Sequence, residues 1–85
     1  MLSRLKLYFT HHSIPDERFI EVLREHNLNP YQEYDKTIHR ISMLECVVQI
    51  FKELARVSND HSYDQTIKTY ETDIELLRSK EHDEH

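Results

Sequence analysis

The sequence predicts an all-α fold: a small bundle of three main helices plus a short N-terminal helix, wrapped around a long central helix at about residues 35–57. Two observations predict it. The 85 residues include no glycine and only two prolines, which disfavours tight β-hairpins, glycine-rich phosphate loops and Rossmann turns. In addition, residues 35–57 carry apolar side chains at helical spacing around well over half of the helix circumference.

The central segment has two adjacent apolar stripes and one polar stripe. Its many charges make it unsuitable as a membrane span, so we expect neighbouring helices to cover it on several sides and predict no membrane partner. The core positions that we assign to it are Ile41, Leu44, Val47, Val48, Phe51 and Leu54. The polar stripe, which we interpret as solvated, comprises Ser42, Glu45, Gln49, Lys52 and Arg56, with Glu53 beside it.

Length and composition indicate one helical domain over residues 1–80, followed by a charged, frayed tail over residues 81–85. With 38% apolar and 32% charged residues, the chain is too apolar for a disordered protein. The single cysteine, Cys46, excludes an intramolecular disulfide and is expected to be a small buried hydrophobe. The N-terminal segment lacks the long apolar run of a signal peptide, which predicts a protein that is cytosolic or made in a cytosol.

The formal net charge of −5 argues against a dedicated nucleic-acid-binding protein. Lys36 with Arg40, and Lys52 with Arg56, form i,i+4 basic pairs that could face DNA. The acidic total favours a solvated stripe instead.

The first helix is expected over residues 1–10, with Leu2, Leu5 and Phe9 on one face. A second helix opens at Pro15, with Ser13 or Ile14 as its cap. It contributes Phe19 and Leu23 to the core, and its end is marked by Asn27 in the left-handed conformation and by Pro30.

Two aromatic residues, Tyr31 and Tyr34, lie in a short connector before Asp35, which we expect to cap the central helix. After a loop over residues 58–62, a final helix runs from Tyr63 or Asp64 to Ser79. Its narrow apolar seam consists of Tyr63, Ile67, Tyr70, Ile74 and Leu77, of which we assign Ile67, Tyr70 and Ile74 to the core.

No catalytic motif, cofactor motif or metal-ligand spacing is found, and we predict that the chain is not an enzyme. The adjacent pair His11 and His12 could be read as a fragment of a metal site, but neighbouring residues on a helix diverge and cannot converge on one ion. His82 and His85 could bind a metal weakly, although a solvated tail is the simpler interpretation.

The tyrosines combine a large contact area with a polar tip, which is typical of interface residues. Tyr31 and Tyr34 could equally pack across helix junctions within the monomer. The residues that we predict at an interface are Arg4, Lys6, Tyr31, Tyr34 and Tyr63.

One run carries a family resemblance, and its sequence is Leu28-Asn29-Pro30-Tyr31-Gln32-Glu33-Tyr34-Asp35-Lys36. It follows an amphipathic helix that opens with Pro15-Asp16-Glu17, and it precedes a long apolar helix containing Leu54-Ala55. This order resembles the small all-helical head–tail connector (adaptor) proteins of tailed bacteriophages. The start Arg4-Leu5-Lys6-Leu7 also fits the pattern, whereas the short loop over residues 58–62 departs from it.

The resemblance implies a structural virion protein in the phage neck, present in the host cytoplasm during assembly. Copies would form a homo-oligomeric ring, expected to be dodecameric, below the portal protein. The ring would extend the DNA channel, let DNA pass without sequence specificity, and join the head to a tail-side stopper or tail protein. A ring also supplies burial that a small domain lacks.

An alternative is a small helical regulatory or inhibitory module, antitoxin-like or host-takeover in kind, that docks a helix on a target. In a connector, Tyr31, Tyr34 and the basic N-terminal segment would lie at contacts with other subunits or with the portal. In a regulator, they would be ordinary surface.

Overall fold

The long helix α3 (Lys36–Ser58) is the central element of the fold in this computed structural model, which describes residues 1–83 and the side chains of residues 1–80. The Asp35 carboxylate caps it as predicted, accepting a hydrogen bond from the Thr37 N–H at 2.9 Å. It ends at Asn59, whose φ of 51° is left-handed. The side chains that α3 buries completely are those of Met43, Cys46, Val47 and Ile50.

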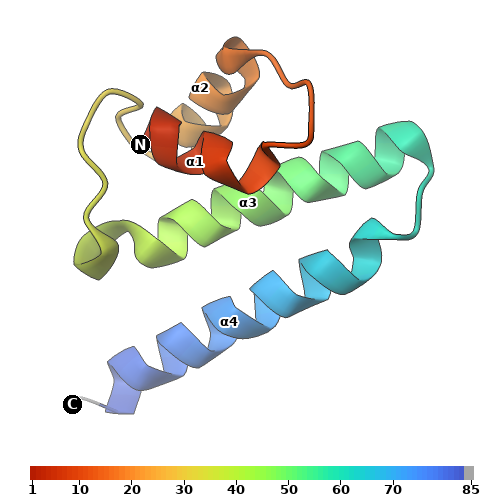
Figure 1. The fold of residues 1–85 in the computed structure, drawn as a ribbon. Helices are drawn as coiled ribbons and strands as arrows, with labels where there is room; N and C mark the ends of the chain where they lie inside the picture. The colour runs from red at the N-terminus through yellow and green to blue at the C-terminus, as the bar shows by residue number, and fades with distance from the viewer. Residues whose placement is uncertain (84–85) are drawn as a thin grey trace.

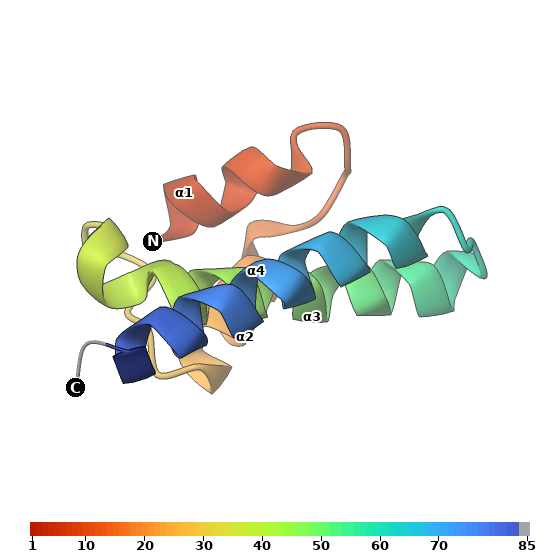
Figure 2. The same ribbon diagram turned by 90° about the horizontal axis from the view of Figure 1, so that it is seen from below.

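Three helical segments surround α3. A short helix α1 (Leu2–Lys6) continues into the 3-10 turn η1 (Leu7–Phe9), and α2 (Asp16–Glu25) follows. The helix α4 (Tyr63–Asp83) runs back along α3 as an antiparallel hairpin, while α1 and α2 cover other sides of α3 (Figures 1 and 2). The described residues contain helices and turns but no strand, which confirms the predicted all-α class.

Residues from all four helices and η1 form one apolar core. Buried side chains include those of Leu5, Phe9, Phe19 and Leu23, packed against the inner faces of α3 and α4. Of the positions assigned to the core from the sequence, Phe19, Leu23, Leu44, Val47, Val48, Phe51, Ile67 and Ile74 are buried, and Ile41, Leu54 and Tyr70 are partly buried against them. The core includes an aromatic cluster, in which the ring centroids of Phe9 and Phe51 lie 4.6 Å apart.

Three helix boundaries differ from the prediction. α4 continues to Asp83 instead of ending at Ser79, because residues 80–83 contain no glycine or proline to end it. It therefore runs into the predicted tail, of which residues 84–85 lie outside the described part. Pro15 itself, rather than Ser13 or Ile14, is the N-cap of α2 and provides no side-chain cap. The first segment is helical only to Lys6 and then tightens into η1.

The end of α2 explains how a chain without glycine turns sharply. Asn27 has a φ of 60°, as predicted, and its N–H donates to the Arg24 carbonyl at 3.0 Å. The Leu28 N–H donates to the Leu23 carbonyl at 2.9 Å, which completes a Schellman motif. Leu28 is buried, so this turn fixes the start of the connector against the core.

None of the helices in the described part of the chain combines the length and the apolar character that crossing a bilayer requires.

Candidate functional site

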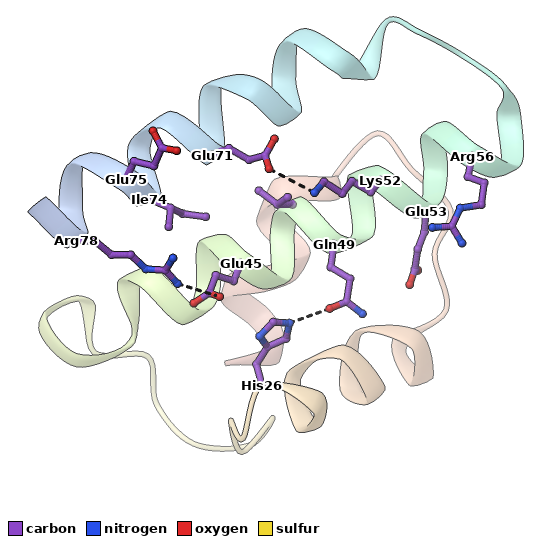
Figure 3. Close-up of a pocket in the computed structure, with 11 residues that line it drawn as sticks. His26, Glu45, Gln49, Lys52, Glu53, Arg56, Glu71, Ile74, Glu75 and Arg78 are labelled. Atoms are coloured by element: carbon purple, nitrogen blue, oxygen red, sulfur yellow. Dashed lines mark hydrogen bonds and ion pairs between the residues drawn. The ribbon is translucent and has the colours of Figure 1, made fainter.

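The polar stripe of α3 lines a groove between α4 and the C-terminal end of α2 (Figure 3). The groove has a volume of about 550 Å³, and two apolar side chains, Val48 and Ile74, lie at its base. Its other lining residues are His26, Glu45, Gln49, Lys52, Glu53, Arg56, Glu71, Glu75 and Arg78. The stripe that we interpreted as merely solvated therefore faces the charged side chains of two neighbouring helices.

Ion pairs between α3 and α4 form one wall of this groove. Arg78 lies 3.3 Å from Glu45, and Lys52 lies 3.3 Å from Glu71 (Figure 3). Exposed pairs of this kind each contribute about 0.2–1 kcal/mol and are screened by salt. Their main effect is to fix the register of the hairpin.

Hydrogen bonds between α2 and α3 form the other wall. Arg18 donates to both carboxylate oxygens of Glu53 through Nε and Nη2, with Nε 3.0 Å from Oε2, and the hydrogen bond to Glu53 raises the pKa of Arg18. Further along the wall, Gln49 Nε2 donates to Glu25 at 2.6 Å, so Gln49 Oε1 accepts from His26 Nε2 at 2.8 Å. This arrangement places a proton on His26 Nε2.

Two charged residues of the groove differ from the rest. Among residues 1–80, no side chain forms an ion pair with Arg56 or with Glu75. Both side chains are exposed at the rim. Among the charged lining residues, Arg56 and Glu75 are therefore the cation and the anion without an ion-pair partner within residues 1–80.

The connector between α2 and α3 forms a second exposed surface. The Met1 ammonium donates to the Gln32 carbonyl at 2.5 Å, and the Leu2 N–H donates to the Pro30 carbonyl at 2.9 Å. Asn29 Oδ1 accepts from the Tyr31 N–H at 2.9 Å. These bonds hold the connector in place while the Tyr31 side chain is 74% exposed.

The structure brings together only some of the residues predicted at an interface. Arg4 stacks over the ring of Tyr34 at 4.9 Å, and partial burial raises the pKa of Tyr34. Lys6 forms an exposed ion pair with Asp16 at 3.1 Å. Tyr63 lies at the start of α4, where it is partly buried and its hydroxyl is 3.1 Å from His12 Nε2. Tyr31 is the most exposed of the three tyrosines in the predicted set.

The chemically reactive side chains do not converge on either surface. Burial raises the pKa of the Cys46 thiol to about 12, so the reactive thiolate is scarce at neutral pH. Among the described residues, no group of three or more His, Cys, Asp or Glu side chains could hold a metal ion. The possible metal pair His82 and His85 falls outside the residues whose side chains are described.

Sequence reasoning missed several groove residues because their partners lie on other helices. Glu71, Glu75 and Arg78 belong to exposed positions of α4 that look like ordinary solvated charges, and His26 is the partly buried C-cap of α2. A usable signal was present in α3 itself, whose polar stripe carries charges of both signs, at Glu45, Lys52 and Arg56, on an otherwise apolar helix.

Comparison of the chain with protein-family models, with curated proteins and with solved structures finds no match.

Proposed function

We propose that this protein is a subunit of a head–tail connector ring in a tailed bacteriophage. The observation that supports the proposal best is the position of the family-like run at residues 28–36. Its apolar residues, Leu28 and Pro30, are buried, whereas Tyr31 projects from the loop between α2 and α3, which the N-terminal residues hold in place. A rigid loop presenting an exposed tyrosine suits a permanent protein contact, because little conformational entropy is lost on binding.

The charge and size of the chain also support a structural role. An acidic subunit with a formal net charge of −5 would let DNA slide through a channel without gripping it. A domain of 85 residues gains stability when further surface is buried between copies. Partners in this proposal are other copies of the chain, the portal protein and a tail-side stopper or tail protein.

Quantitative mass spectrometry of purified phage particles tests the proposal. A connector is expected at a fixed copy ratio to the portal protein in particles that have been washed and banded. Detection only in lysates of infected cells, with none in particles, would rule the connector role out.

The second candidate is the regulatory protein-binding module. The open groove beside α3 favours it, since a groove flanked by two helices suits a helical segment of a target. That outcome would be supported by the lysate-only result, together with co-purification of one host or phage protein at a constant ratio.

A further inference from the structure

We propose that the groove between α2, α3 and α4 is the receptor for the connector loop of a second copy of this chain. The inference rests on the proposed function in one respect: a ring needs two different surfaces on each subunit that fit one another. The groove and the loop between α2 and α3 are two such surfaces. Each carries exposed charged side chains that have no ion-pair partner among the described side chains.

The charges of the two surfaces are complementary. The groove rim carries Arg56 and Glu75, which have no ion-pair partner among residues 1–80. The connector and the start of α3 carry Glu33 and Lys36, which are also exposed and without an ion-pair partner among those residues. Docking would place Lys36 against Glu75 and Glu33 against Arg56.

The spacing of these charges is compatible with simultaneous contact. Glu71 pairs with Lys52 and Arg78 pairs with Glu45, so Glu75 lies level with Val48 on α3. Arg56 is two turns further along α3, about 12 Å away along the axis. Glu33 and Lys36 are three residues apart, which spans up to about 10 Å of chain. The length of the four side chains covers the difference.

The exposed aromatic ring of the loop extends the contact beyond the charged pairs. Tyr31, 74% exposed, precedes Glu33 by two residues. With Lys36 at Glu75 and Glu33 at Arg56, the chain direction carries Tyr31 past Arg56, toward the C-terminal end of α3. Its ring would add contact area there while its hydroxyl stays in water, as is common for interface tyrosines.

The contact is heterologous, because the connector of one copy meets the groove of another. Such contacts propagate from copy to copy and close into a ring when the rotation between copies allows it. A two-fold dimer would require each pair of copies to exchange both contacts at once.

Charge reversal on the full-length chain tests the inference. Self-association of the wild type, Lys36→Glu, Glu75→Lys and the double variant is measured by sedimentation velocity over a range of concentrations. Each single reversal is expected to weaken association at least about tenfold, because it replaces an attraction by a like-charge contact. The double variant is expected to recover most of the wild-type association. Glu33→Arg with Arg56→Glu provides an independent second pair.

A matched control comes from the same helix. Asp73→Lys makes the same change of charge as Glu75→Lys at an exposed α4 position outside the groove lining, and is expected to leave association unchanged. Circular dichroism and thermal melting of every variant separate loss of association from loss of fold.

Four results would overturn the inference. Three of them are a wild type that stays monomeric at all concentrations, single reversals without effect, and a double variant that fails to recover. An effect of Glu75→Lys without an effect of Lys36→Glu would mean that the groove meets a different surface of the second copy, which would equally overturn the inference. The mass-spectrometry test of phage particles is independent of this one. If the protein self-associates through this contact but is absent from virions, the connector function is ruled out while the proposed contact is still supported.

Discussion

At the scale of single residues, the environment of Cys46 determines its chemistry. The side chain is fully buried, and its thiol points toward the Val22 carbonyl oxygen at 3.9 Å. Burial raises its pKa to about 12, with smaller contributions from Glu45 and Glu25. A residue in this state is a packing element rather than a nucleophile.

We therefore expect Cys46 to resist thiol reagents in the folded protein at neutral pH. Titration with a chromogenic disulfide reagent should give less than one reacted thiol per chain over minutes, and one per chain at once in concentrated urea. Rapid stoichiometric labelling without denaturant would contradict the burial of this residue. Labelling rates across urea concentrations would also report how often the core opens.

Val47 shows the cost of placing a charge in the same core. Its side chain is fully buried on α3. Val47→Asp is expected to unfold the protein, because an aspartate there has no partner and would need to be desolvated. Val47→Ala, the matched control, should cost only roughly 2 kcal/mol. Thermal melting by circular dichroism measures both, and a wild-type melting temperature for Val47→Asp would mean that α3 is placed wrongly.

At the scale of elements, the ends of the helices depend on asparagine. Asn27 and Asn59 occupy the left-handed conformation after α2 and α3, with φ values of 60° and 51°. In most proteins glycine occupies such positions, but this chain contains none. Asparagine is the best substitute, since its short polar side chain tolerates positive φ.

Replacement of Asn59 tests this role. Asn59→Ala is expected to lower the free energy of unfolding by about 1 kcal/mol, because a Cβ-bearing residue without the local polar contacts of asparagine is disfavoured there. Asn59→Gly should be neutral or slightly stabilising. Urea unfolding followed by circular dichroism measures the difference. Equal stabilities for the alanine and glycine variants would count against a left-handed turn at the end of α3.

The helices could be predicted from the sequence because local signals define them. The apolar stripes of α3, the cap at Asp35 and the turn at Asn27 all act within a few residues. The end of α4 could not be placed, because residues 80–83 carry neither a breaking nor a clear continuing signal. The change from α1 to η1 could not be placed either, because no local breaking signal marks it.

The groove could not be predicted, because it depends on which helices become neighbours. Arg78 pairs with Glu45 on another helix, although Glu75 was available at i−3 on its own helix. Similarly, the interface prediction could not separate Tyr31 from Tyr34. Only the folded chain shows that Tyr34 stacks under Arg4 while Tyr31 is exposed.

At the scale of the whole molecule, this difference between the two tyrosines allows a clean test of assembly. Tyr31→Ala is expected to leave the melting temperature unchanged and to weaken self-association about tenfold or more. Tyr34→Ala is expected to lower the melting temperature, since it removes a partly buried ring that packs against the core. Sedimentation velocity combined with thermal melting resolves the two effects. If Tyr31→Ala associates as strongly as the wild type, the loop between α2 and α3 is not part of the interface.

The hydrogen bonds between the first two residues and the connector have a consequence for how the chain folds during synthesis. Met1 and Leu2 reach their final places only after Pro30 and Gln32 have left the ribosome. Because the core side chains of α1 and α2 pack against α3, this N-terminal unit is complete only once α3 has also emerged, and α4 then packs against α3. Since most contacts join elements that follow one another in the chain, we expect folding to be fast and to proceed in the order of translation.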